Sequence, residues 1–252
     1  MKARMRPRRA IRWVAIGAIS LGALWQVATV PSTARQGVNF QVSTSTLPLY
    51  VKAIDFLHRH EHYRLLANEI TRGCHSGQER VLAVFAWTRG NIRRTPKGWP
   101  IVDDHVWNIM IRGHGLGDQM ADVFTTLATY AGLPAFWRPG VVTLSFVQVE
   151  GRWTMFDVAN GLIFTDARGQ LADVNELLRD PKLIQMTSGS LAVGDRPYEQ
   201  YVARLRPFHV PAVLRARQQM PLPRLFFEAK RLLRLVPAAE APQPSVRPVE
   251  AP

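Results

Sequence analysis

A glycine-rich turn leading into a helix is the part of this sequence best suited to hold a reactive group. Residues 113–124 read GHGLGDQMADVF, and the helical pattern that follows continues to Gly132. The N-terminus of a helix stabilises an anion and lowers the pKa of a thiol placed there. The position where such a nucleophile is expected is Gly117, which has no side chain. The stretch therefore has the form of an active-site turn without its reacting atom.

Other candidate groups lie upstream of this turn. Cys74 is the only cysteine and is followed by His75, but it lies in a loop about 40 residues before the turn, and a catalytic thiol needs its partners within reach. The chain can form no internal disulfide, so the fold must rest on its core.

Three histidines form the run HRHEH. Of these, His58 and His62 are spaced to share one helical face and could bind a metal, whereas His60 falls on another face. No third ligand is evident, so a solvated helix end is the alternative, and we expect neither a metal nor a cofactor.

A polar group precedes the turn directly. Asp103 or Asp104 beside His105 could raise the pKa of the imidazole and make an acid–base pair in the same cleft. The alternative is that these residues cap the apolar segment that follows, which is favoured because no nucleophile accompanies them.

The elements that must position these groups are helices first and strands second. Residues 48–73 and 79–92 have helical periodicity, and Ser76 with Glu79 resembles a capping box. The helix after Gly117 presents an apolar face and has Asp118 as its N-cap or first-turn anion; the face comprises Val123, Phe124, Leu127, Tyr130 and Ala131.

The pattern then changes to period two. The runs VVTLSFVQV and RWTMFDV flank Glu150-Gly151, which predicts an antiparallel hairpin. GLIFTDARGQL can add a strand, and DVNELLRD predicts a short helix. Helices followed by strands indicate an α+β fold with an antiparallel sheet.

Taken together, these motifs resemble the transglutaminase-like superfamily. The resemblance rests on the glycine turn, D-Q-x-A near the start of the helix, AGLPA at its end, and a hairpin with Gly-Arg-Trp and an Asp four residues after the Trp. It covers roughly residues 48–165. It implies a papain-like core in which a cysteine on the helix attacks an amide or ester carbonyl, a histidine on a strand takes its proton, and an Asp or Asn orients the histidine.

The resemblance carries over only in part. The cysteine position falls on Gly117, the histidine position falls near Ser145, and the third position falls on Asp157. A glycine cannot attack a carbonyl, and a serine is a poor base at neutral pH. Asp157 then has no histidine to orient, so a carboxylate that makes turn hydrogen bonds is the better interpretation. Further residues expected in the residual cleft are Asp103, Asp104, His105, Asp118, Gln119 and Trp153.

The excess of basic residues that gives the net charge of +13 is concentrated at the two ends of the chain. Residues 1–12 carry six basic residues and no acid, whereas residues 13–200 carry 17 basic and 16 acidic residues. A nucleic-acid binder more often has a basic face on its folded body, so we expect no nucleic-acid partner.

The basic N-terminus precedes an uncharged run, WVAIGAISLGALWQVATV, which predicts a signal peptide or a membrane anchor. Ser32-Thr33-Ala34 resembles a cleavage site. We therefore expect membrane contact through residues 13–30, and the basic amphipathic helix 222–236 suggests either a second contact or a helix packed on the body. The predicted location is the bacterial periplasm, or the inner membrane with the domain on its periplasmic side.

The chain divides by composition into five parts. These are a signal or anchor segment (1–34), a linker (35–47), a transglutaminase-like domain (48–200), a basic helical extension (201–237) and a Pro/Ala-rich tail expected to be disordered (238–252).

Three functions stay open at this point. The first is a catalytically inactive domain that binds a partner protein or a cell-envelope polymer. The second is a hydrolase or acyl-transfer enzyme with displaced acid–base residues. The third is a structural or assembly protein that works at the membrane. The residues favour the first.

Overall fold

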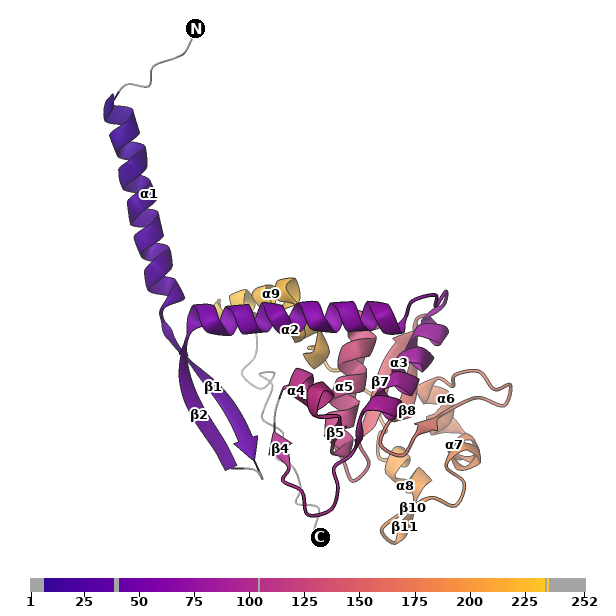
Figure 1. Cartoon of the computed structure of the whole chain (residues 1–252). Coiled ribbons are helices and arrows are strands. Elements are labelled where there is room, and N and C mark those ends of the chain that lie inside the picture. The colour runs from indigo at the N-terminus through magenta and orange to yellow at the C-terminus, as the bar shows by residue number, and fades with distance from the viewer. Residues whose placement is uncertain (1–6, 39–40, 104, 234, 236–252) are drawn as a thin grey trace.

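The computed structural model describes residues 7–38, 41–103, 105–233 and 235. The chain begins with helix α1 (Pro7–Ala28) and an antiparallel hairpin of strands β1 (Pro31–Val38) and β2 (Gln41–Pro48), which together extend away from the body (Figure 1). Strand β1 also pairs with β4 (Val102–Asp103). The stretch 35–47 thus falls within this hairpin, and Ser32-Thr33-Ala34 lies inside β1.

The prediction of membrane attachment through residues 13–30 is corrected by the structure. Within the part of the chain that the structure describes, no helix is both long and apolar enough to span a bilayer. The uncharged run is helical only to Ala28, since the chain leaves the helix for β1.

The second proposed membrane contact, the helix 222–236, is also corrected, because this helix belongs to the body. Helix α9 (Pro221–Leu232) follows the short 3-10 helix η1 (Arg215–Gln219) and buries Phe227. An ion pair of 3.2 Å between Arg215 and Asp122 holds η1 against the central helix. Leu225, on the same helix, is 64% exposed.

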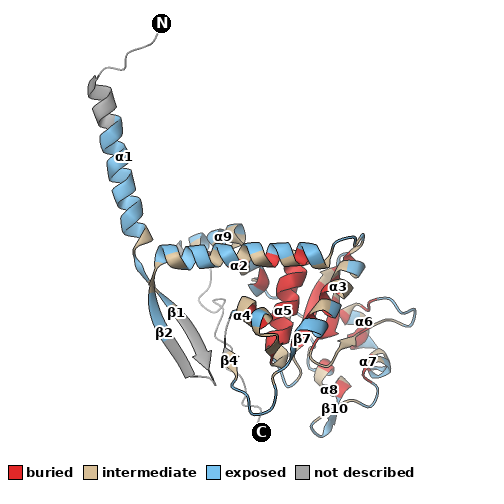
Figure 2. Cartoon of the chain, viewed as in Figure 1, coloured by how far each residue is buried: buried red, intermediate tan, exposed pale blue. Residues whose placement is uncertain are grey.

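Two helices lead into the core. Helix α2 (Leu49–Ile70) is long and largely exposed, and helix α3 (Gly77–Asn91) follows it after a turn (Figure 2). The predicted N-cap of α3 is confirmed, because Ser76 Oγ accepts a hydrogen bond of 3.1 Å from the Glu79 backbone amide. Gly77 lies against Val149 and Leu133, so the start of α3 packs beside the end of the central helix.

The central helix is α5 (Gly117–Tyr130). Its predicted apolar face is confirmed: Val123, Phe124 and Leu127 are buried, and so is almost every other residue from 119 to 129. The helix ends as predicted, with Gly132 at φ +84°, a left-handed conformation that glycine adopts without strain.

The predicted antiparallel sheet is present, with strand order β6-β7-β8-β9. Its strands are β6 (Ala135–Arg138), β7 (Leu144–Val149), β8 (Arg152–Asp157) and β9 (Leu162–Ile163). The hairpin turn between β7 and β8 has positive φ at both Glu150 and Gly151, as a type I′ turn requires.

The two faces of the sheet bury different sets of residues. Val147 and Phe156 face α5, whereas Phe146 and Met155 face a second layer. That layer holds α6 (Val174–Arg179), α7 (Pro181–Ser188), strands β10 (Ala192–Val193) and β11 (Arg196–Pro197), and α8 (Tyr198–Ala203). The fold class is therefore α+β, as the sequence predicts.

Candidate functional site

The turn that leads into α5 is built from a parallel strand pair. Helix α4 (Val106–Arg112) ends at Gly113, and β5 (His114–Gly115) pairs with β3 (Arg93–Arg94) before α5 begins. Gly115 is required there because a Cβ would lie 2.9 Å from the Cβ of Gln119. A close approach of backbone to side chain thus sets the direction in which the helix starts.

Gln119 fixes the first turn of α5. Its Oε1 accepts a hydrogen bond of 3.0 Å from the Leu116 amide, and its Nε2 donates one of 2.6 Å to the Val102 carbonyl. Asp118 lies in the first turn, where an anion is favourable, and its Oδ1 accepts from the Gln119 amide at 2.8 Å. The buried glutamine is therefore a support of the turn.

Gly117 is the first residue of α5 and is half-buried. A Cβ built on it would lie 3.3 Å from the Cβ of Ala159, in the loop after β8. This distance is tight for a carbon pair. A side chain at position 117 would thus meet the neighbouring loop at one atom, which would have to shift by a few tenths of an ångström.

Ser145 lies on the face of the sheet that packs against α5. It is fully buried and pairs across the ladder with Phe156 and Trp137. Among the described residues its Oγ has no hydrogen-bond partner. Because neighbouring strand residues point to opposite faces, the register places Leu144 across from Asp157, and Leu144 is apolar and buried. Neither Ser145 nor Leu144 provides an imidazole that could take a proton from a nucleophile at position 117.

Asp157 is fully buried and committed to structural hydrogen bonds. Its Oδ1 accepts from the Asn160 amide at 3.0 Å, and its Oδ2 accepts from Asn160 Nδ2 and from the Tyr198 hydroxyl, each at 2.7 Å. Burial and the neighbouring carboxylate raise the pKa of Tyr198 well above its usual value, so the hydroxyl stays protonated and donates. The carboxylate ties α8 to the turn after β8.

Two arginines hold the same loop from the other side. Arg89 Nη1 donates to the carbonyls of Val158 and Ala159 at 3.2 and 3.0 Å, and its guanidinium lies against Gly161. Arg94 Nη2 donates to Asn160 Oδ1 at 2.9 Å. Helix α3 and strand β3 thereby fix the loop 158–161 that stands against Gly117.

The remaining predicted cleft residues are spread out. Trp153 packs against Phe136 with ring centroids 5.1 Å apart, on the face of the sheet away from α5. His105 is exposed at the residue before α4. Asp104 and the side chain of Asp103 lie outside the described residues.

Cys74 is far from this turn. It is half-buried in the connection between α2 and α3, near the end of α5, because Gly77 contacts Leu133. A helix the length of α5 spans about 20 Å, which separates the thiol from Gly117.

His114 is the residue that sequence reasoning missed. Its Nδ1 lies 3.4 Å from Thr95 Oγ1, and its ring makes an edge contact of 5.1 Å with Trp99. Desolvation, and then the Arg112 charge, lower its pKa below the usual range of histidine. The position of His114, three residues before Gly117 in the sequence, is the signal that could have identified it as a site residue.

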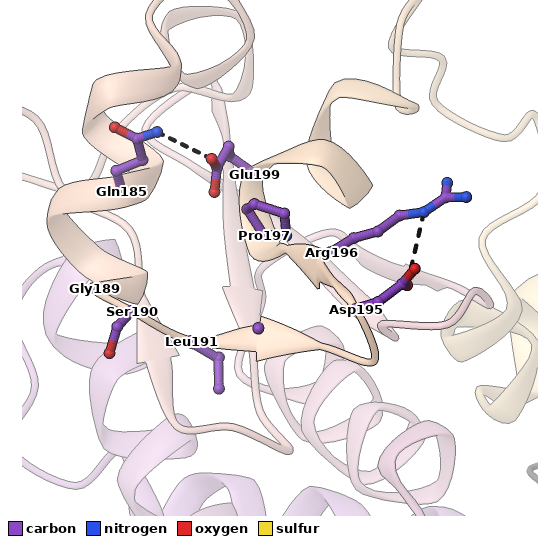
Figure 3. A pocket seen from close by; sticks show the side chains of 9 residues that line it. Gln185, Gly189, Ser190, Leu191, Asp195, Arg196, Pro197 and Glu199 are labelled. Carbon is purple, nitrogen blue, oxygen red and sulfur yellow. Dashed lines mark hydrogen bonds and ion pairs between the residues drawn. The ribbon is translucent and has the colours of Figure 1, made fainter.

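Two surface hollows lie away from this turn. One, of about 410 Å³, is between α7 and the β10–β11 hairpin, where Gln185 Nε2 donates to Glu199 Oε1 at 3.0 Å (Figure 3). The other, of about 260 Å³, is lined by Arg152, Arg168 and Gln170. Neither is lined by the Gly117, Ser145 or Asp157 positions.

Comparison with known proteins gives one family match. The model of the transglutaminase-like superfamily matches residues 64–160, from α2 to the loop after β8. No curated protein matches the chain.

Two solved structures are similar in part. One is a proposed cysteine protease from Cytophaga hutchinsonii, at 15% identity and a TM-score of 0.36, over 48% of this chain and 45% of that one. The other is a proposed protease from Parabacteroides distasonis, at 10% identity and a TM-score of 0.32, over 52% of this chain and 36% of that one. The chain thus spans less than half the length of either structure. The similarity to the transglutaminase-like superfamily therefore covers residues 64–160, which hold α3, α5 and the β7–β8 hairpin.

Proposed function

We propose that this transglutaminase-like domain acts by binding and performs no thiol-based acyl transfer. The observation that carries the proposal is Gly117 at the start of α5, with Ala159 3.3 Å from the site where a Cβ would be. A helix N-terminus can activate a thiolate, but here no thiol stands there.

The surroundings of Gly117 support the same proposal. A cysteine mechanism needs an imidazole within reach and a carboxylate or amide to orient it. The strand offers a buried serine and a buried leucine instead, and the three hydrogen bonds on Asp157 come from Asn160 and Tyr198. The Asp157 carboxylate, which would orient the histidine of a triad, instead accepts a hydrogen bond from Tyr198 of α8.

The test is a search for turnover with the full-length chain. We expect no release of amine or alcohol from peptide amides, glutamine side chains or activated esters, and labelling by iodoacetamide at Cys74 alone. The Cys74→Ser variant is the control, and it should fold like the wild type and remain unlabelled. Turnover of any of these substrates by the wild type would contradict the proposal, and its loss in Cys74→Ser would assign the reaction to the thiol.

The binding surface we propose is the loop 93–100, next to the turn. Trp99 is 56% exposed, and its ring contacts His114. Arg93, Arg94 and Lys97 are exposed in the same loop. An exposed aromatic face beside three cations fits an acidic polysaccharide, because the ring can stack on a sugar and the cations attract its carboxylates.

Affinity electrophoresis with polygalacturonate, and with neutral dextran as the reference polymer, tests this surface. Trp99→Ala and Lys97→Gln should each reduce retardation by polygalacturonate, whereas Lys182→Gln, an exposed cation on α7, should not. Equal retardation of all variants, or equal retardation by dextran, would remove the acidic polymer as the ligand.

A second candidate function rests on the contact between Thr95 and His114. A hydroxyl 3.4 Å from an imidazole whose pKa is lowered has the form of a nucleophile and its base. If the chain hydrolyses an activated ester, His114→Gln and Thr95→Val should each abolish that activity while far-UV circular dichroism stays unchanged. Loss of activity in Cys74→Ser instead would exclude this pair.

A further inference from the structure

Two histidines on α2 bring their ring nitrogens together. His58 and His62 are one helical turn apart, and their Nε2 atoms lie 2.9 Å from each other. Residues at this spacing are neighbours on a helix surface. His58 is exposed and His62 is half-buried, so the pair lies at the surface of α2.

Trp107 holds one of the two rings in place. The His62 ring stacks on it with centroids 4.4 Å apart and planes at 24°. Trp107 is itself fixed at the start of α4, where its backbone amide donates a hydrogen bond of 2.9 Å to Tyr63 Oη. Half of the pair is thus oriented before any ligand arrives.

The distance between the nitrogens selects a coordination geometry. Metal–imidazole bonds of about 2.0–2.1 Å that meet at a right angle place the two nitrogens about 2.9 Å apart, whereas a tetrahedral angle requires about 3.3 Å. The separation of 2.9 Å is that of a hydrogen bond between the two rings, and it equals the separation of neighbouring corners of a square or an octahedron, so a metal could replace the shared proton with little movement of the nitrogens. Imidazole ligands in that geometry favour Cu²⁺ and Ni²⁺ over Zn²⁺.

We propose that His58 and His62 form a two-histidine site for Cu²⁺ or Ni²⁺, with water in the remaining positions. Within the described residues no cluster of three His, Cys, Asp or Glu side chains could hold a metal, so the site has two protein ligands. The nearest acids on the helix are engaged: Asp55 pairs with Arg59, and Glu61 pairs with Arg64.

The experiment is a titration of the full-length chain with Ni²⁺, Cu²⁺ and Zn²⁺, each alone, in the Cys74→Ser background to remove the thiol. Calorimetry should give one site per chain, and Trp fluorescence should fall as the metal occupies the site next to Trp107. His58→Gln and His62→Gln should each weaken binding by at least about 10-fold, since even the loss of an outer-shell partner costs that much.

His209→Gln is the matched control, because His209 is exposed and lies outside the pair. It should bind like the parent chain. Equal affinity in all three variants would overturn the site, and tighter binding of Zn²⁺ than of Ni²⁺ would overturn the geometry. If His62→Gln fails to fold through the loss of its stacking on Trp107, His58→Gln, at an exposed position, decides the question.

Discussion

The role of Asp157 can be tested at its partner, Tyr198. In Tyr198→Phe the ring still fills its buried place beside Phe164, but the hydrogen bond of 2.7 Å to Asp157 Oδ2 is lost. A hydrogen bond to a charged group contributes about 1.5–3 kcal/mol, and no water can replace it because both side chains are fully buried. We expect the free energy of unfolding to fall by about 2–3 kcal/mol.

Urea unfolding followed by circular dichroism measures this change. With a slope of about 2–3 kcal/mol per molar, the midpoint should fall by about 1 M. Tyr201→Phe is the matched control on the same helix, since its hydroxyl donates to the Val193 carbonyl at 2.8 Å and is half-buried. Water can replace that neutral bond, so the control should lose only about 0.5–1 kcal/mol.

The two outcomes have different meanings for function. If Tyr198→Phe and Tyr201→Phe lose the same small amount, Tyr198 does not hold the Asp157 carboxylate, and Asp157 becomes available to orient a base. That result would refute the structural role on which the proposed absence of a triad depends. A large loss confined to Tyr198→Phe would support it.

Three further predictions concern the core around the turn. Ser145→Ala removes a buried hydroxyl that has no hydrogen-bond partner among the described residues, so the free energy of unfolding measured in urea should rise by about 1 kcal/mol. Ser145→His should overpack the face of the sheet against α5 and lower the free energy of unfolding by about 1–3 kcal/mol, or prevent folding. Gly115→Ala should lower the thermal midpoint through the contact of 2.9 Å with Gln119, while Gly90→Ala, where a Cβ meets no atom within 4 Å, serves as its control and should not lower it. Because the pKa of Tyr198 is raised in the folded state, its contribution to the free energy of unfolding is fully present below about pH 10. Above about pH 10 the tyrosine ionises in the unfolded state, and the free energy of unfolding should fall by about 1.4 kcal/mol per pH unit. The fall should be smaller in Tyr198→Phe.

The sequence predicts the central elements because their signals are local. Helix α5 has its glycine turn, its apolar face and its stop at Gly132 within one short segment, and the hairpin has a two-residue turn with positive φ. The Asp173–Arg179 stretch likewise contains its own cap, because Asp173 Oδ1 accepts from the Asn175 amide at 2.8 Å. Elements of this kind need no distant partner to be identified.

The site residues could not be placed in the same way, because their roles depend on contacts between distant segments. Tyr198 lies 41 residues after Asp157, and Arg89 lies 70 residues before the Ala159 carbonyl it binds. Strand register also decides which side chain lies across from Asp157, and a change of one residue exchanges Ser145 for Leu144. The prediction of membrane attachment through residues 13–30 was wrong, since no helix in the described ranges is both long and apolar enough to span a bilayer.

The register gives a structural reason for the aspartate at the position that the resemblance assigns to the triad. A carboxylate at the end of β8 can accept from the turn that follows and from a hydroxyl of the second layer, so its removal would leave buried donors on Asn160 and Tyr198 without an acceptor. At Gly117 a Cβ would lie 3.3 Å from Ala159, in a loop that Arg89 holds in place, and this close approach favours a small residue there. Packing thus gives a structural reason for the aspartate at position 157 and a close contact at position 117, and both support the proposed binding role.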